Sequence, residues 1–428
     1  MKEIKLSKVN ETIYYDTCDN GLDIYLWVNE RANEYYATLN VKYGSIDTKF
    51  KVKNNVYEVP NGVAHFLEHI NFNEKDGKTA HDVFDQMGTS INAFTTFDFT
   101  SYEVYGTNDI ILNVNHLLDY VETPVITKDL VKKESGIIVE EVKMGDNNPS
   151  NKMYYGTNNI VFHTNKKRNQ VTGTVDDVEN ITAENLKLVY NTFYHPSNMF
   201  LIVTGNFNPY EMMMAIKENQ DNKKFPKYAN PKVIKEKEDV SVVTNYQEIF
   251  SNVEIPKINV VYKMSKKAFK NIEEIILRFG LTTLINANFG PTSEFKEELM
   301  EKELITGMGT SIDFEENDIV VITISCETKY PQEIINMIKE NMQNLDITKE
   351  RLNRRIKVNV AQYITSFDDI EYINSYIQSE IITFKKIHND VFDTFKNIDI
   401  DTIKSILKHI NTDNVAVMVQ LPQKKTNS

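Results

Sequence analysis

The chain has 428 residues, carries 48 Lys and Arg against 61 Asp and Glu, and has a formal net charge of −13. Because a usual domain has roughly 100–200 residues, we expect two or more packed units with separate cores. The acidic balance argues against a basic, phosphate-binding surface, so nucleic acid is not an expected partner.

Three features of the sequence bear on the cellular compartment. The first 15 residues carry five charges and lack the apolar centre of a secretory signal. Cys18 and Cys326 are the only cysteines, and their wide separation favours neither a disulfide framework nor a metal site. The uncharged stretch 188–210 is interrupted by polar residues, so no membrane span is expected there. A cytoplasmic location follows as the expectation.

Apolar periodicity and β-forming residues predict the elements of the first half. In chain order they are strands 22–28 and 36–43, a helix at 62–72, strands 90–97 and 100–106, helices at 109–121 and 128–144, and a strand at 200–205. The first two strands are separated by a short polar segment and are expected to form a hairpin. The last strand is apolar throughout, so neighbours must cover both of its faces.

A linker is predicted between the two halves. Residues 217–239 are rich in Lys, Asp, Glu and Asn, contain two prolines and show no useful apolar periodicity. Beyond them the pattern predicts strand 258–264, helices 270–288 and 293–305, strand 319–326, several further helices and strand 414–421. This order of elements resembles that of the first half.

We therefore predict an α+β protein with two homologous domains, each a mixed β-sheet with helices packed on one face. The predicted boundaries are 1–215 for the N-terminal domain, 216–240 for the linker and 241–428 for a C-terminal domain without a metal site.

The helix predicted at 62–72 carries the sequence His-Phe-Leu-Glu-His from residue 65 to 69. Residues four apart lie one turn above each other on a helix, so His65 and His69 can hold one metal ion. The rest of the helix is apolar nearly all round, and buried ionisable groups need a compensating partner. Two imidazoles and a carboxylate leave a Zn²⁺ ion an open position for water, whose proton Glu68 can accept. A chance polar stripe is the alternative.

A third ligand must come from another element. The helix predicted at 128–144 offers Glu134, Glu140 and Glu141. The first and third are seven residues apart and share a face with Ile137 and Ile138, whereas Glu140 points away. An ordinary charged helix face is the alternative. The remaining histidines have no ligand-type spacing and are His81, His116, His163, His195, His388 and His409.

Four segments together carry a resemblance to a known family. They are the inverted zinc motif His-x-x-Glu-His, the acidic pair downstream of it, Ser-Ile-Asn-Ala-Phe-Thr at 90–95, and Tyr-His-Pro-Ser-Asn at 194–198. Through its first half the chain resembles the family of pitrilysin, insulin-degrading enzyme and mitochondrial-processing peptidase. It is most similar to the smaller bacterial members, which have one half-shell per chain.

The resemblance implies that the N-terminal domain is the zinc-binding catalytic domain of a processing-peptidase-like half-shell. It implies one Zn²⁺ per chain, with His65, His69 and Glu141 as ligands, Glu68 as the base and Glu134 as an acid that orients the site. Imidazole and carboxylate ligands also accept Mn²⁺ or Co²⁺.

The same resemblance implies a substrate-binding strand. Asn92, Ala93, Phe94 and Thr95 would form an edge strand to which an extended peptide is added by main-chain hydrogen bonds. The alternative interpretation is an ordinary internal strand with Phe94 and Phe97 in the core.

The second half departs from the family's pattern. Similar enzymes place an Arg, and a Tyr seven residues later, after a Ser-initiated helix, where both donate to the substrate carbonyl as it gains charge. Here Met300 and Gly307 stand at those positions. Neither side chain can donate a hydrogen bond.

We therefore predict a zinc endopeptidase subunit that cleaves peptides or unfolded segments in an enclosed chamber. Its expected partner is a homologous subunit that lacks the zinc motif and forms a heterodimer with it, and a homodimer is the alternative assembly. The alternative function is a non-catalytic or partner-dependent scaffold subunit of a peptidase-like complex.

Overall fold

The computed structural model describes residues 1–75 and 77–423. Their backbone contacts divide into two compact units, each assembled from separate stretches of chain. The first unit consists of residues 1–144, 169–235 and 364–391, and the second of residues 145–168, 236–363 and the chain from residue 392 onward. Because the two units interleave along the sequence, they do not test the predicted continuous domains, which stay a prediction.

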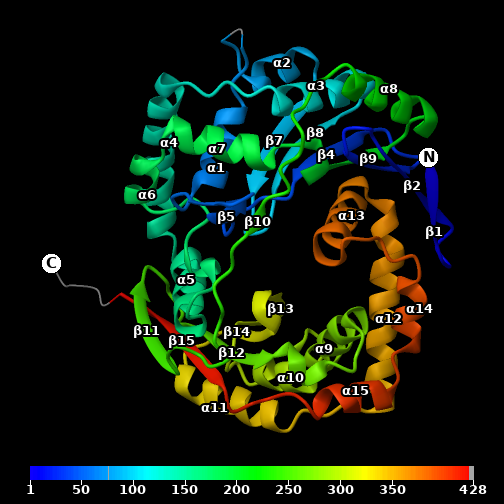
Figure 1. The fold of residues 1–428 in the computed structure, drawn as a ribbon. Coiled ribbons are helices and arrows are strands. Elements are labelled where there is room, and N and C mark those ends of the chain that lie inside the picture. Colours follow the sequence, from blue (N-terminus) through cyan, green and yellow to red (C-terminus); the bar gives the residue numbers. More distant parts are fainter. Residues whose placement is uncertain (76, 424–428) are drawn as a thin grey trace. The chain divides into compact units, whose positions relative to one another are not determined.

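A mixed sheet forms the centre of the first unit (Figure 1). Its strands, in spatial order, are β1 (Lys2–Leu6), β2 (Glu11–Thr17), β3 (Asp23–Val28), β9 (Met199–Gly205), β4 (Tyr35–Val41), β8 (Thr100–Gly106) and β7 (Ser90–Thr95). β3 and β9 are parallel, and all other neighbours are antiparallel. The α+β class with mixed sheets is thus confirmed.

The predicted hairpin of residues 22–28 and 36–43 is wrong. β9 lies between β3 and β4, parallel to the first and antiparallel to the second. Every residue of β9 is buried. A strand that is apolar on both faces is most stable in the middle of a sheet, and this preference separates the two strands that are neighbours in sequence.

Helices cover one face of this sheet (Figure 1). They are α1 (Val63–Asn71), α2 (Ala80–Gln86), α3 (Ile110–Glu122), α4 (Lys128–Asn147), α6 (Val175–Asn180), α7 (Ala183–Phe193) and α8 (Pro209–Asp221). Ala37, Leu39 and Val41 of β4 belong to the apolar core that these helices share with the sheet. A small sheet of β10 (Lys232–Val233), β5 (Lys49–Val52) and β6 (Asn55–Glu58) belongs to the same unit.

A helix from the second half of the chain packs on β4 and β9 as well. This helix, α13 (Ile370–Phe384), makes polar contacts with the sheet. Thr38 Oγ1 donates to Asn374 Oδ1 at 2.8 Å, and Thr204 Oγ1 donates to the Ile370 carbonyl at 2.8 Å. Strand alternation turns Thr38 and Asn40 away from the apolar core. The apolar pattern of the sequence did not indicate this packing, because local periodicity does not show which sheet a helix contacts; the same helix also buries Ile373 and Ile377.

The second unit is built on a five-stranded mixed sheet (Figure 1). Its spatial order is β11 (Tyr246–Ser251), β15 (Val415–Pro422), β12 (Lys257–Ser265), β14 (Ile319–Glu327) and β13 (Gly307–Glu315), and only β11 and β15 are parallel. The outer strands β11 and β13 were not predicted.

Helices pack on both faces of this second sheet. One apolar core joins it to α9 (Glu274–Phe289), α10 (Glu294–Glu301), α11 (Pro331–Gln343) and α15 (Ile400–Leu407). The other face is covered by α5 (Pro149–Val161). The same half of the sequence also forms α12 (Lys349–Thr365) and α14 (Val391–Asn397). No helix within the described residues combines the length and the apolar composition needed to cross a membrane.

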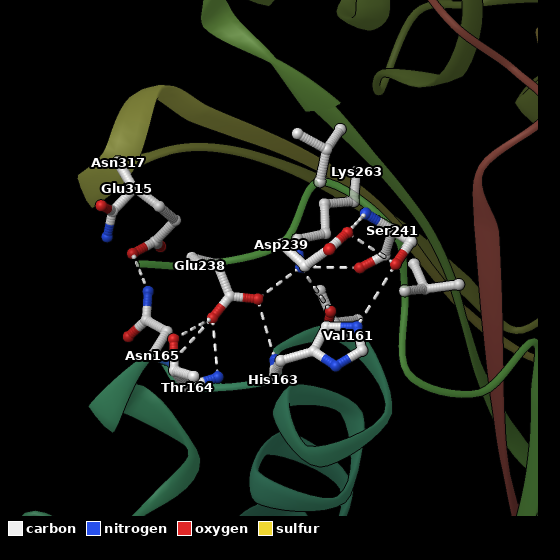
Figure 2. A network of polar contacts seen from close by, with 12 residues as sticks. Val161, His163, Thr164, Asn165, Glu238, Asp239, Ser241, Lys263, Glu315 and Asn317 are labelled. Carbon is white, nitrogen blue, oxygen red and sulfur yellow. Dashed lines mark hydrogen bonds and ion pairs between the residues drawn. The ribbon is translucent and has the colours of Figure 1, made fainter. Parts of the chain in front are cut away.

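A fully buried ion pair holds Glu238, in the segment before β11, against the rest of the second unit. Lys263 Nζ lies 2.6 Å from Glu238 Oε1, and neither side chain is more than 1% exposed. Glu238 also accepts hydrogen bonds of 2.7–2.8 Å from the backbone amides of His163, Thr164 and Asn165 (Figure 2). Burial raises the pKa of Glu238, but the bonds from Lys263 and the amides outweigh it and lower the pKa to about 2.

Candidate metal centre

Helix α1 places two histidines and a glutamate close together on one helix. It begins after Gly62, whose φ of 83° is left-handed. A Cβ at this position would lie 2.2 Å from the Thr172 carbonyl oxygen, so only glycine lets the chain enter the helix here. The helix packs on α7 and β7. His65 and Glu68 are consequently buried, at 9% and 6% exposure.

Helix α4 brings its acids to the same place. Glu134 is buried, and Ile138 is fully buried next to it on the helix. Ile137, which the sequence pattern places on the same face, is 49% exposed, because one step along a helix turns a side chain well away from its neighbour. Glu140 is exposed and pairs with Lys143 at 2.7 Å. Helical phase therefore separates this acid from the other two.

His65, His69 and Glu141 converge on one point. His65 Nε2 lies 3.6 Å from Glu141 Oε1, and His69 Nε2 lies 3.6 Å from Glu141 Oε2. One donor atom of each residue lies within 4.8 Å of the other two, and no other such group of His, Cys, Asp and Glu occurs in the described chain.

The spacing of these donors fits a divalent cation. Separations of 3.6 Å are longer than hydrogen bonds. Two ligand atoms that are each about 2.1 Å from a tetrahedral Zn²⁺ ion lie roughly 3.4 Å apart. Two imidazole nitrogens and a carboxylate oxygen are also a donor set that Zn²⁺ accepts in proteins. The three residues thus fit the metal in both geometry and chemistry.

Glu134 lies behind His69. Its Oε2 is 3.7 Å from His69 Nδ1, the ring nitrogen that does not face Glu141. A carboxylate beside the second nitrogen of a metal-binding histidine favours one ring orientation and tautomer, here at an ion-pair distance that is longer than a hydrogen bond. His65 differs, because its Nδ1 is buried without a hydrogen-bond partner among the described residues.

The electrostatics of these side chains favour bound positive charge. Burial lowers the pKa of His69, but Glu134 and Glu141 outweigh it and raise the pKa to about 9. Burial, reinforced by His69, lowers the pKa of His65 to about 4, so this ring is neutral near pH 7. The carboxylates that favour a proton on His69 attract a metal cation equally, and ligation displaces that proton.

Glu68 lies on α1 beside the three donors and is not one of them. Its Oε2 accepts a hydrogen bond from Thr95 Oγ1 at 2.7 Å. Burial raises the pKa of Glu68 to about 6, although the bond from Thr95 acts in the opposite direction. A buried carboxylate of this kind can both accept and return a proton near neutral pH.

Strand β7 contains the predicted peptide-binding residues Asn92, Ala93, Phe94 and Thr95. It is the outermost strand of its sheet and pairs with β8 alone among the described strands, so the interpretation as an internal strand is wrong. Phe94 is half-buried and packs edge-to-face on Phe99. An open strand edge is what strand addition requires, and peptide docking here stays a prediction.

A buried polar chain beneath α1 was not predicted. Asn71 Nδ2 donates to Tyr102 Oη at 2.7 Å, and Tyr102 Oη lies 2.9 Å from Tyr194 Oη. All three residues are buried, so these bonds fix the end of α1 relative to the sheet. The signal in the sequence is the Tyr-His-Pro-Ser-Asn segment that begins at Tyr194. His195 in the same segment bonds the Pro226 carbonyl at 2.8 Å rather than a metal site.

The two positions expected to carry oxyanion donors have no donor side chain. Met300 is 43% exposed on α10. Gly307 is the first residue of β13, and a Cβ added there would meet nothing within 4 Å. Both residues belong to the second unit.

Two family models match this chain. The model described as Insulinase (Peptidase family M16) matches residues 37–175, which include α1, β7 and the acids of α4. The model described as Peptidase M16 inactive domain matches residues 180–358, which include Met300 and Gly307.

Relatives and solved structures agree with these matches. A Bacillus subtilis (strain 168) protein named "Uncharacterized zinc protease YmfH" is 32% identical over 431 residues, which cover 99% of this chain and 100% of that protein. The crystal structure of an M16-like peptidase from Alicyclobacillus acidocaldarius has a TM-score of 0.89 and 27% identity, and the match covers 96% of this chain and 99% of that one. A protease from Helicobacter pylori shares the fold, with a TM-score of 0.81, 18% identity and coverage of 96% and 99%.

Proposed function

The chain belongs to the peptidase M16 family, and from this premise we propose that it is the zinc-binding subunit of an endopeptidase that cleaves peptides or unfolded segments. The observation that carries the proposal is the convergence of His65, His69 and Glu141 on one point, with Glu68 beside them. Relatives named as zinc proteases support the same chemistry.

The residues around this point have separate roles in the proposal. His65, His69 and Glu141 hold one Zn²⁺ per chain, and Glu134 orients the ring of His69. When bound, the ion supplies Lewis-acid activation of a water molecule and of the peptide carbonyl. Mn²⁺ and Co²⁺ are compatible with the same donors.

Glu68 moves the proton. Thr95 bonds its Oε2, which leaves Oε1 to accept a proton from the attacking water. The same oxygen then returns the proton to the nitrogen of the leaving amine, so that the peptide bond breaks without forming a free amide anion. Burial excludes bulk water from the carboxylate and keeps the transfer local.

The peptide lies along β7 in this proposal. The Thr96 amide donates to the Phe99 carbonyl at 2.8 Å, which marks a hydrogen-bonded pair at the end of the β7–β8 hairpin. Bonded and non-bonded pairs alternate in antiparallel register, so the main-chain groups of Ala93 and Thr95 point away from β8. These groups are available to an added strand. Pairing through the main chain accepts many sequences, which fits a peptide substrate without a fixed motif.

A homologous partner subunit completes the proposal. The side chains of Met300 and Gly307 cannot donate a hydrogen bond to the carbonyl oxygen of the substrate as it gains charge. A second chain without the zinc motif would therefore supply an Arg and a Tyr as these donors, and the two chains would enclose a chamber. The same missing donors favour the rival function, a non-catalytic scaffold subunit. The presence of Glu68 argues against that rival, because a structural metal site has no use for a base. A cytoplasmic location is part of the proposal.

The test separates metal binding from proton transfer. Glu68→Gln keeps the shape of the side chain and removes its basicity. We expect this variant to retain one equivalent of zinc and to lose peptide cleavage by at least about 100-fold, measured with the partner present. Loss of zinc in this variant would overturn the separation of roles, and full activity would exclude Glu68 as the base.

A further inference from the structure

We propose that Thr95 is a positioning residue that holds Glu68 and connects it to the strand on which the peptide docks; this deepens the proposed function and rests on it. Thr95 Oγ1 donates to Glu68 Oε2 at 2.7 Å, across the contact between β7 and α1. The two residues are 27 positions apart, so the bond exists only in the folded chain.

The strand geometry gives Thr95 two separate contacts. Side chains alternate along β7, and Ile91, Ala93 and Thr95 turn toward the helices, where Ile91 is buried in the core and Ala93 packs against it. The main-chain N–H and C=O groups of Thr95 lie in the plane of the sheet and point to its open edge, because Thr95 and Thr100 form a non-hydrogen-bonded pair. A peptide added to this edge therefore bonds to the same residue that holds Glu68.

The hydroxyl of Thr95 fixes one oxygen of the Glu68 carboxylate. It donates to Oε2 and leaves Oε1 on the other side of the group. Within the described residues it is the one side chain that hydrogen-bonds Glu68. Without it the carboxylate is free to rotate about its side-chain bonds, and a misplacement of about 1 Å can cost on the order of 100-fold in rate.

Three variants test the proposal. Thr95→Val removes the hydroxyl and keeps the β-branched shape, and Thr95→Ser keeps the hydroxyl. Thr17→Val is the matched control, because Thr17 Oγ1 also donates to a carboxylate, that of Asp23 at 2.9 Å, in the same sheet but in β2. The zinc-loaded proteins are assayed with fluorescence-quenched peptides, with the partner subunit present, for kcat, KM and zinc content.

We expect Thr95→Val to lower kcat by roughly 10- to 100-fold with KM within about twofold and zinc content unchanged. Thr95→Ser should restore kcat to within about threefold of the wild type, and Thr17→Val should match the wild type. An unchanged kcat in Thr95→Val, a change confined to KM, or a Thr95→Ser variant as slow as Thr95→Val would each overturn the proposal.

Crystal structures of the wild type and Thr95→Val provide a readout that does not depend on activity. The Glu68 carboxylate should be ordered against Thr95 in the wild type and should leave that position, or become disordered, in the variant. An unmoved carboxylate would overturn the positioning role. If the wild type cleaves no peptide, the proposed function fails by itself, and the two structures still decide whether Thr95 positions Glu68.

Discussion

Glu134 Oε2 lies 3.7 Å from His69 Nδ1, while Glu141 Oε2 lies 3.6 Å from Nε2 of the same ring. One helix, α4, thus supplies a carboxylate to each nitrogen of this histidine. The two acids are seven residues apart, a separation of about two helical turns, so both point to α1. In our proposal this arrangement makes Glu141 a metal ligand and Glu134 the group that orients the ring of His69.

The first prediction concerns which acid holds the metal. Glu141→Ala should remove most of the bound zinc, because it deletes one of the three converging donors. Glu134→Ala should weaken zinc binding by roughly 10- to 100-fold, as expected for a group that acts through His69. Glu140→Ala is the matched control and should bind as the wild type does, since Glu140 pairs with Lys143 at the surface. Zinc titration of the three variants decides this, and equal affinities for Glu140→Ala and Glu141→Ala would contradict the assignment.

A second prediction uses the register of the β7–β8 hairpin. Ala93→Pro removes an amide that points to the open edge, so the hydrogen bonds within the hairpin should remain. Peptide affinity should fall severalfold, because one main-chain hydrogen bond is worth about 0.5–1.5 kcal/mol. Phe94→Pro removes an amide that faces Ser101 of β8 and should destabilise the fold instead.

These two proline variants are compared in the inactive Glu68→Gln background, by fluorescence anisotropy of a labelled peptide and by thermal melting. A folded Ala93→Pro protein with unchanged peptide affinity would exclude docking at this edge.

The third prediction concerns the missing oxyanion donors. Each donor is worth on the order of 10²–10³ in rate in enzymes that possess it. The isolated chain should therefore cleave peptides slowly, and addition of a homologous subunit that carries Arg and Tyr but no zinc motif should raise the rate by at least about 100-fold. Peptide cleavage before and after mixing measures this. An isolated chain that is already as fast as the mixture needs no partner.

The fourth prediction concerns the stability of the second unit. The pKa of Glu238 is about 2 in the fold against an ordinary value of 4.5, so folding favours its ionised form. The stability that this provides is present above about pH 4.5 and is lost as the pH falls toward 2. Glu238→Gln should flatten this part of the pH profile and, because it leaves Lys263 buried and unpaired, should cost about 3–5 kcal/mol near neutral pH.

Urea unfolding of Glu238→Gln and of the exposed control Glu236→Gln, followed between pH 2 and pH 7, measures this effect. A Glu238→Gln profile that runs parallel to the wild type would show that the buried pair does not titrate as proposed.

The sequence alone was sufficient for the parts of this protein that depend on neighbours along the chain. Helical period places His65 and His69 one turn apart and separates Glu140 from Glu134 and Glu141, because side-chain direction on a helix follows from residue number. The same local logic predicts β9 as a strand buried on both faces and places the elements that it does predict to within a few residues, although it misses others, such as β1, β2 and α5.

Tertiary structure decided everything that depends on which elements meet. The insertion of β9 between β3 and β4, the polar docking of α13 on the first sheet and the bond from Thr95 to Glu68 join residues that no period relates. The outer strands β11 and β13 were not predicted, although Met308, Ile312 and Phe314 alternate along β13 and pack on the core of the second unit. The pairings are set by the total burial and hydrogen bonding of the folded chain, a property of the three-dimensional packing that no local stretch of sequence contains.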